Sequence, residues 1–374
     1  MSYKSVAAPL IVVAVAIIIA VRAESGQIAW TPDGYNYGVH MLVDVGMSKR
    51  EATATAQRFY STTTVGLDPR YAHYFKDDVP PYAWTLFSPR VVYPFAASLL
   101  YRFRGMYSLI DISAAAYVLA AVVLYWFLLG FGPPLTATLG ALGFALWPRI
   151  TALASTDLTD MTALLFWIVT LAVGCRIVHS GKRGWILAFV PACAVLSFTR
   201  PVPYLPFGAG VGVLAAGLLY KNRQATFAGA WMSGIAVACA FAVTIALRAA
   251  DAPSFTFVLG LAQERYSATA AERQLALSTW YERTLFYIMR AELGHALRAV
   301  LPLLAASGAL LRKAHPYVPL LAGAAAFALV SILTNPIALD SRRTFEVPLY
   351  PLISAGLVLL AGVATERFSR QRLG

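Results

Sequence analysis

Long apolar runs separated by short polar connections cover most of the chain. A membrane-spanning helix needs about 20 mostly apolar residues, and the runs approach that length. They cover residues 6–21, 107–129, 135–150, 158–178, 185–198, 202–220, 227–247, 297–311, 318–333 and 347–364. Several runs are short, which indicates tilted helices or a locally thin bilayer. The pattern predicts an all-α polytopic membrane protein with about ten transmembrane helices.

A first polar insertion, residues 24–106, follows the first apolar run. Residues 47–60 within it have a helical pattern but are too polar to span a bilayer, so we expect an interfacial helix there. Residues 95–103 are apolar but short, and we expect a half-helix that enters the interface without crossing the membrane. The prolines between these two segments exclude one regular helix through the insertion.

A second polar insertion covers residues 248–296. Within it, residues 261–272 and 280–292 are amphipathic enough to form helices on the surface. The sequence contains no repeat of fixed period and no low-complexity tract. We therefore expect a single membrane domain, residues 1–374, whose two insertions carry interfacial helices.

The composition agrees with this class, because 59% of the 374 residues are hydrophobic and only 13% are charged. That balance is too apolar for a soluble domain. The formal net charge of +12 would favour a nucleic-acid partner in a soluble chain. Here the basic residues lie mostly in short connections between apolar runs, which the positive-inside rule explains. We therefore expect membrane lipids as partners and no nucleic acid.

The basic connections also predict an orientation. They are residues 176–183, 221–223, 312–315 and 367–372. If both termini are cytoplasmic, all four lie inside, and the two insertions and the more acidic loops face outward. This orientation requires that residues 95–103 do not cross the bilayer. We interpret the chain as a multi-pass protein of the bacterial inner (cytoplasmic) membrane, with the chemistry on its outer face.

Asp33 is the candidate catalytic residue. It lies in the stretch 30–40, Trp-Thr-Pro-Asp-Gly-Tyr-Asn-Tyr-Gly-Val-His, at the point where the first apolar run should leave the bilayer. Pro32 before it and Gly34 after it predict a turn that directs the carboxylate back toward the membrane surface. Crowding by aromatic rings favours the neutral form of a carboxyl group, which suits a group that has to take up a proton. The alternative is that Asp33 only caps a following helix.

Asp157 and Asp160 form a second pair of carboxylates. They are three residues apart and share one face if a helix has begun before them. One interpretation makes them functional second carboxylates. The other is structural, because Ser155-Thr156-Asp157 is a good N-cap sequence and the helix dipole favours acidic residues at a helix start. The sequence leaves both open.

The sequence contains little that would hold a metal. Cys175, Cys193 and Cys239 lie inside apolar runs without CxxC or Cys/His spacing, so neither a zinc site nor a disulfide framework is expected. Asp157 and Asp160 together suit a divalent cation, but no third ligand is evident. We therefore expect no cofactor and no metal, and a divalent cation is the less favoured alternative.

Four arginines lie next to prolines or before the last apolar run: Arg90, Arg200, Arg342 and Arg343. A guanidinium group binds phosphate in a bidentate fashion. The alternative is that these side chains reach toward lipid head groups. Positive charge on the outer face runs against the topology bias, so we expect phosphate binding by Arg90 and by at least one of Arg342 and Arg343. For Arg200 both interpretations stay open.

Aromatic and histidine side chains near these groups are candidates for lining a sugar or acceptor pocket. They are Tyr35, Tyr37, His40, His73 and Tyr93. Each of them alone is more simply explained by packing or by the aromatic belt at the membrane interface.

The layout resembles the GT-C superfamily of integral-membrane glycosyltransferases, which includes protein O-mannosyltransferases, aminoarabinose transferases and mycobacterial lipid mannosyltransferases. A first helix precedes a long loop with an acid near its start, Asp33, and an acidic loop with Asp157 and Asp160 precedes the fourth span. The segment Arg342-Arg343-Thr344-Phe345-Glu346-Val347-Pro348-Leu349-Tyr350-Pro351 resembles the Arg-Tyr-x-x-x-x-x-Pro pattern that these enzymes carry before a late helix. The resemblance in layout covers nearly the whole chain.

This resemblance implies transfer of a sugar, with inversion, from a polyprenyl-phosphate donor to a lipid, glycan or protein acceptor outside the cytoplasm. Asp33 would be the general base, and the arginines would bind the lipid phosphate. Many family members have Asp-Glu or Asp-Asp where this chain has Asp33-Gly34, a departure that puts a metal-dependent version in doubt.

Other classes remain in competition. A transporter or flippase of a lipid-linked sugar would place ionisable residues at mid-membrane on broken helices, and Pro191, Pro203 and Pro206 leave this open. A polymerase or ligase of surface polysaccharide would use the same donors. A non-catalytic scaffold has little reason to gather carboxylates with arginines.

Overall fold

The structure is a computed structural model, and most of the residues that it describes lie in helices. It describes residues 4–25, 30–63, 84–85, 87–251, 260, 263, 269–293, 296–334 and 347–371. Within these ranges there are helices and their connections and no β-strands. The predicted all-α class is therefore confirmed at this level.

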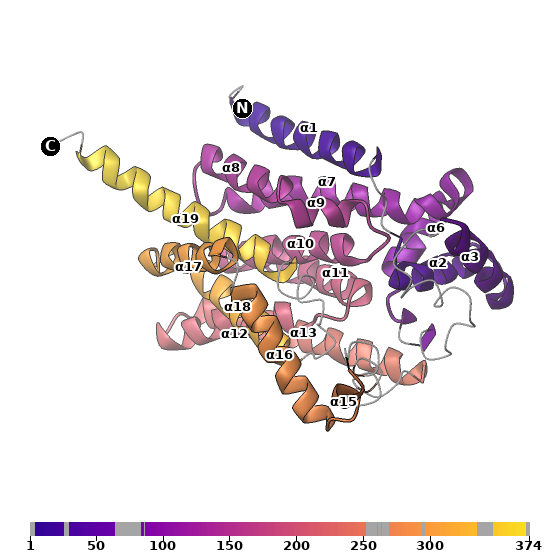
Figure 1. Ribbon diagram of the computed structural model, residues 1–374. Helices are drawn as coiled ribbons and strands as arrows, with labels where there is room; N and C mark the ends of the chain where they lie inside the picture. Colours follow the sequence, from indigo (N-terminus) through magenta and orange to yellow (C-terminus); the bar gives the residue numbers. More distant parts are fainter. Residues whose placement is uncertain are drawn as a thin grey trace.

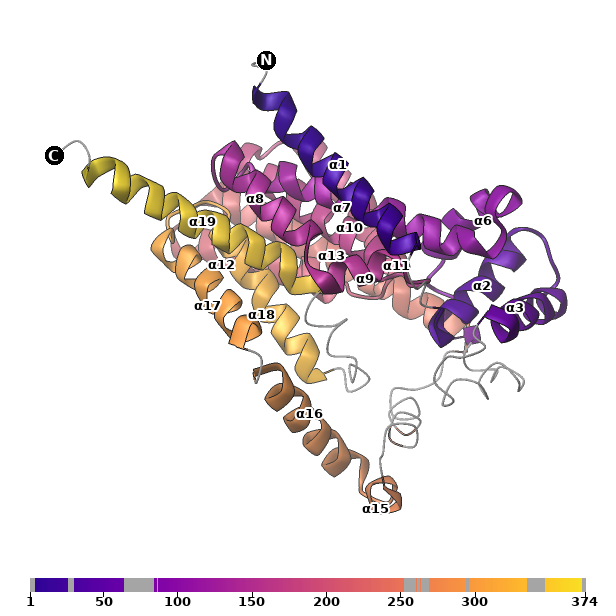
Figure 2. The same ribbon diagram turned by 45° about the horizontal axis from the view of Figure 1, so that its top comes forward.

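Most of the described helices form one bundle (Figure 1). These helices are α1 (Lys4–Ser25), α7 (Ser108–Leu128), α8 (Pro134–Ala145), α9 (Pro148–Ala154), α10 (Asp160–Ser180), α11 (Arg183–Thr199), α12 (Tyr204–Leu219), α13 (Arg223–Ala249), α17 (Ala296–Leu311), α18 (Val318–Thr334) and α19 (Val347–Gln371). Three further helices pack together at one end of the bundle: α2 (Pro32–Asp44), α3 (Lys49–Thr63) and α6 (Val92–Arg104). Figure 2 shows α16 (Leu277–Leu293) and the short α15 (Ala270–Arg273) extending away from the bundle.

Four described stretches are long and apolar enough to cross a membrane: Val92–Leu128, Asp160–Ser180, Arg223–Ala249 and Pro348–Thr365. A fifth is obtained if α8 and α9 count as one bent span. The remaining apolar helices, such as α12 and α18, are shorter than 18 residues in their described apolar parts. The protein is thus a helical membrane protein by length and composition, and the ten predicted spans stay a prediction.

The predicted span over residues 135–150 is wrong as a single straight helix. α8 ends at Ala145, α9 begins at Pro148, and the two axes meet at 64°. Pro148 lacks a backbone N–H and disfavours helical geometry at the residue before it. Trp147 accordingly has extended backbone angles, φ −69° and ψ 120°. The proline therefore breaks the apolar run into two helices.

The predicted half-helix over residues 95–103 is confirmed as a helix by α6, Val92–Arg104, and its position relative to the bilayer stays a prediction. The chain continues through a 3₁₀ turn, η1 (Gly105–Tyr107), into α7. Gly105 has a φ of +57°, which favours glycine and allows the direction of the chain to change. The predicted interfacial helix over 47–60 is confirmed as a helix by α3, and the one over 280–292 by α16. Most of the segment 261–272 lies outside the described residues.

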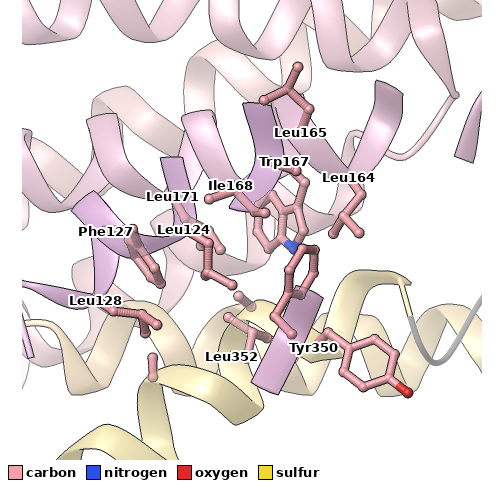
Figure 3. Packing of buried hydrophobic residues seen from close by; sticks show 14 of the residues in the cluster. Leu124, Phe127, Leu128, Leu164, Leu165, Trp167, Ile168, Leu171, Tyr350 and Leu352 are labelled. Carbon is pink, nitrogen blue, oxygen red and sulfur yellow. The ribbon is translucent and has the colours of Figure 1, made fainter. Parts of the chain in front are cut away.

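Part of the core of the bundle lies where α7, α10 and α19 meet (Figure 3). Leu124, Trp167 and Leu352 are buried there. The indole Nε1 of Trp167 donates a hydrogen bond of 3.0 Å to the carbonyl oxygen of Pro348, because a buried indole N–H needs a partner. This bond fixes the first turn of α19 against α10.

Two ends of the bundle can be distinguished. The Asp157 end is where α10 begins, α11 ends, and α2, α3 and α6 pack. The Phe131 end is where α7 ends and α8 begins, and there Phe131 stacks on His315 with 5.5 Å between ring centroids. The start of α1 and the end of α19 both lie toward the Phe131 end in Figures 1 and 2.

Candidate active site

The stretch that carries Asp33 is a helix start and not the turn that the sequence predicted. α2 begins at Pro32, and Thr31 is its N-cap residue, whose hydroxyl accepts a 2.9 Å hydrogen bond from the backbone N–H of Gly34. Proline suits the first helical position because its fixed φ matches the helix and its missing N–H is not needed there. Asp33 therefore occupies the first turn of α2, and its side chain is partly exposed.

Asp157 lies in the connection between α9 and α10 and is completely buried, with 0% exposure. Its carboxylate accepts hydrogen bonds from the backbone N–H of Thr31 at 2.9 Å, from the Thr31 hydroxyl at 2.9 Å and from the Tyr60 hydroxyl at 2.6 Å. Thr31 caps α2, and Tyr60 lies near the end of α3. One carboxylate thus connects three separate segments of the chain.

Gly34 allows this close approach. A Cβ atom added at Gly34 would lie 1.7 Å from Oδ2 of Asp157, far inside van der Waals contact. The first turn of α2 therefore presents its backbone directly to the carboxylate. A negative group in this place is favoured by the partial positive charge of a helix N-terminus.

The N-cap interpretation of Asp157 for the helix that follows it is wrong. α10 begins at Asp160, its N-cap residue is Thr159, and no side chain caps it by a hydrogen bond. Asp157 instead accepts bonds at the start of α2, a helix more than 100 residues away in the sequence. Asp160 does lie in the first turn of α10, as the helix dipole favours.

Burial raises the pKa of Asp157 to about 7, an effect larger than the opposing effect of the hydrogen bonds from Tyr60 and Thr31. The nearby charge of Asp33 adds to the rise. Burial and the charge of Asp157 likewise raise the pKa of the Tyr60 hydroxyl well above its ordinary value. The site therefore pairs a carboxylate inside the protein, Asp157, with one that solvent reaches, Asp33.

Arg90 belongs to the same cluster. Its Nη1 donates a 2.7 Å hydrogen bond to the Tyr37 hydroxyl, which lies 3.2 Å from the hydroxyl of Thr159. The guanidinium carbon lies 4.7 Å from the centroid of the Phe87 ring, a cation–π arrangement. The Nε of Arg90 is buried and has no hydrogen-bond partner among the described residues. A cationic donor is thus joined, through Tyr37 and Thr159, to the segment of the chain that carries Asp157.

Asp160 and Arg200 form a hydrogen-bonded ion pair. Asp160 is 2% exposed, and the Arg200 side chain is 24% exposed. The pair joins the start of α10 to the residue that follows α11. In this structure the charge of Arg200 faces a carboxylate, and its proposed contact with phosphate stays a prediction.

The predicted pocket residues that the structure describes are packed against neighbouring side chains or hydrogen-bonded to the backbone. Tyr93 is buried and donates a 2.8 Å hydrogen bond to the carbonyl oxygen of Leu109. Tyr35 meets the Tyr60 ring edge-on at 5.5 Å. His40 stacks on Trp84 at 3.9 Å. Burial lowers the pKa of His40 to about 4, so this imidazole is neutral at neutral pH.

Three predicted site residues, His73, Arg342 and Arg343, lie outside the described residues. The structure in turn adds Thr31, Tyr60 and Thr159, which the sequence prediction missed. Thr31 carried a signal, because Thr before Pro at a helix start is a typical cap sequence. Tyr60 and Thr159 carried none.

In the described part of the chain, no group of three or more His, Cys, Asp or Glu side chains is placed to hold a metal ion. Among protein-family models no match to this chain was found, and a search of curated proteins gave no match either. Function is therefore argued from the site itself.

Proposed function

We propose that this protein is an integral-membrane glycosyltransferase. It moves a sugar, with inversion, from a polyprenyl-phosphate donor to a hydroxyl group of a lipid, glycan or protein acceptor. The observation that carries the proposal is the convergence at one end of the bundle of a partly exposed carboxylate, Asp33, and a cationic donor, Arg90. Arg90 is joined to Thr159 through Tyr37, and the charge of Asp33 acts on Asp157, which lies two residues before Thr159.

In this reaction Asp33 takes the proton from the acceptor hydroxyl as its oxygen attacks the anomeric carbon of the sugar. The bond between that carbon and the phosphate oxygen breaks, and the lipid phosphate leaves with the electron pair. A phosphate is a good leaving group, so a general acid is not needed. A positioned base contributes about 10²–10⁴-fold to such reactions.

Arg90 is the best-supported phosphate-binding residue. Its Nη1 is used by Tyr37, and its buried Nε has no partner among the described residues. A buried donor without a partner carries a desolvation cost, which a phosphate oxygen would remove. The guanidinium would also stabilise the charge that develops on the leaving phosphate. Arg342 or Arg343 is expected to assist, and for Arg200 the contact with phosphate is left open beside its pairing with Asp160.

We further propose that the Asp157 end faces the outside of a bacterial inner membrane and that both termini are cytoplasmic. The positive-inside rule supports this orientation. The basic residues in the connections near the Phe131 end are Lys182, Arg183, Lys221, Arg223, Arg312 and Lys313. The donor lipid would lie among the apolar helices, with its phosphate at the level of Arg90.

The second candidate is a transporter or flippase of a lipid-linked sugar. One observation favours it, namely the 64° break between α8 and α9, because transporters often build their substrate sites on discontinuous helices. It accounts less well for a partly exposed Asp33 at the end of the bundle.

The test is a comparison of transfer with flux. The protein is reconstituted into liposomes with a radiolabelled polyprenyl-phosphate sugar, with or without a membrane extract that supplies acceptors. A glycosyltransferase releases polyprenyl phosphate and labels an acceptor. Movement of intact donor between leaflets, with no release of polyprenyl phosphate, would replace this proposal with the transporter.

A further inference from the structure

We propose that Asp157 is a positioning residue whose buried carboxyl group holds the first turn of α2, and with it the Asp33 carboxylate, at a fixed place on the bundle. The inference rests on the proposed function in one respect, because the position of Asp33 matters for chemistry only if Asp33 is the base. The hold on α2 itself is a property of the fold.

Accessibility separates the roles of the two carboxylates. Asp157 is completely buried, and three donors from Thr31 and Tyr60 occupy its oxygens. A substrate hydroxyl therefore does not reach it without displacing α2 or α3. Asp33 is partly exposed and is near enough for its charge to act on Asp157. Asp157 thus acts on the reaction through α2.

The bonds made by Asp157 are the ones that determine where α2 begins. The Thr31 hydroxyl donates to Asp157 and accepts from the Gly34 N–H, so the same residue is both the cap of α2 and its attachment to the bundle. The absence of a side chain at Gly34 completes the fit, since the carboxylate occupies the space that a Cβ would fill. Loss of the carboxyl group would leave the Thr31 N–H and the Tyr60 hydroxyl without their acceptor.

The hold should depend on pH. The charged and titratable groups near Asp157 are Asp33 on α2, Tyr60 on α3 and Tyr93 on α6. On α10, Asp160 is paired with Arg200. Asp33, Tyr60 and Tyr93 are not cations, so the effect of burial on the pKa is the largest one. The pKa of Asp157 is therefore about 7 when α2 is in place. A solvated Asp has a pKa of about 4.

The sign follows from proton linkage. In the closed arrangement α2 is attached to the buried Asp157, and in the opened arrangement α2 has moved away and Asp157 is solvated. Between about pH 4 and 7 the closed arrangement binds a proton that the opened arrangement does not, so acid favours closure. As the pH rises through this window, opening of α2 becomes easier, and above about pH 7 its dependence on pH levels off.

The experiment is hydrogen–deuterium exchange of the full-length protein in detergent micelles, with rates divided by those of an unstructured peptide at the same pH. The reporter is the peptide that covers α2, and α18 is the internal reference. Asp157→Ala is compared with Asp157→Asn, which keeps a carbonyl oxygen for the Thr31 N–H but does not ionise. We expect Asp157→Ala to increase exchange in α2 at least about tenfold, and Asp157→Asn to increase it much less.

The pH profile adds a readout that a merely structural contact would not change. Protection of wild-type α2 should fall by up to about tenfold per pH unit between about pH 4.5 and 7, and Asp157→Asn should abolish this dependence. Tyr60→Phe removes a donor that lowers the pKa of Asp157. The levelling point should therefore move upward by about half to one pH unit. If Asp157→Ala does not fold, the wild-type profile and Tyr60→Phe decide.

Wild-type protection of α2 in Asp157→Ala, or identical pH profiles in the wild type and Asp157→Asn, would overturn the inference. The outcome is separable from that of the proposed function. If Asp157→Ala increases exchange in α2 but the wild-type protein has no transferase activity, Asp157 still holds α2 and Asp33 is not a base. If exchange in α2 is unchanged in Asp157→Ala and the wild-type protein is an active transferase, the proposed function stands and the role of Asp157 is discarded.

Discussion

The two ends of the bundle are built in different ways. At the Phe131 end, connections are closed by local devices: Gly181, with φ +61°, ends α10, and the Asn222 side chain caps α13 through the Ala225 N–H at 3.0 Å. At the Asp157 end, the decisive bonds join residues about 100 positions apart in the sequence, as between Tyr60 and Asp157.

The charges differ in the same way. Basic residues at the Phe131 end, such as Lys182 and Lys221, are exposed and remain in water. Asp157 and Asp160 at the Asp157 end are buried, and each needs a donor or a cation in a fixed place. A fold that only needed to span the membrane would have no reason to bear the free-energy cost of burying these carboxylates. This difference is the reason why we propose that the Asp157 end carries the function.

The largest expected effect comes from Asp33 and is sharpened by a control in the same helix. Asp33→Asn should lower transfer from a polyprenyl-phosphate sugar by about 10²-fold or more, because the base is lost. Asp44 is exposed at the other end of α2, and Asp44→Asn should change the rate less than about twofold. Initial rates at saturating donor measure both. Near-normal turnover in Asp33→Asn would remove this residue from the mechanism.

Replacement of glycine by alanine should lower the stability of the protein at the Asp157 end but not at the Phe131 end. Gly34→Ala places a methyl group on Asp157 and should destabilise the protein by about 3 kcal/mol. Gly184, in the first turn of α11 near the Phe131 end, has open space around an added Cβ, so Gly184→Ala should be neutral or stabilise by up to about 1 kcal/mol. Thermal unfolding in detergent compares them. Equal stability of the two variants would contradict the close contact of Gly34 with Asp157.

Arg90 should show the geometry of a phosphate site. Arg90→Ala is expected to raise the KM for the donor by about tenfold or more. Arg90→Lys should raise the KM above the wild-type value by a smaller factor, because lysine keeps the positive charge but cannot bind phosphate in a bidentate fashion. Arg183→Ala near the Phe131 end is the control and should leave the KM unchanged. Indistinguishable Ala and Lys variants would argue against bidentate binding.

The smallest effects distinguish a buried ion pair from an exposed one. Asp160→Asn removes the carboxylate partner of a largely buried Arg200 and should cost about 2 kcal/mol of stability. Asp111 pairs with Arg104, whose side chain is 55% exposed, so Asp111→Asn should cost less than about 1 kcal/mol. Shifts in the thermal midpoint rank the two, and a larger cost at Asp111 would reverse the assignment of which pair supports the fold.

Much of the helical framework could be predicted from hydrophobic patterning. The runs at 297–311 and 318–333 match α17 (Ala296–Leu311) and α18 (Val318–Thr334) almost to the residue. The break before Pro148 was missed, because the apolar run continues across it, although the proline itself is a local signal for a helix break. Local chemistry determines these features, so local sequence predicts them.

The site was predictable only in part. The sequence pointed to Asp33, Asp157 and Arg90, but it assigned Asp157 either to its own helix or to catalysis. Its actual contacts, with Thr31 and Tyr60, arise from the packing of distant segments, which no short pattern encodes. Burial of a carboxylate depends on that packing, and so does its pKa.

The most direct test of the central claim, that the Asp157 end carries out the chemistry, is a cryo-electron microscopy structure with a non-transferable polyprenyl-phosphate sugar bound in a lipid nanodisc. The account predicts phosphate density within hydrogen-bonding reach of the Arg90 guanidinium and the anomeric carbon of the sugar facing Asp33. Donor density elsewhere, with Arg90 and Asp33 both in contact with protein or water alone, would contradict it.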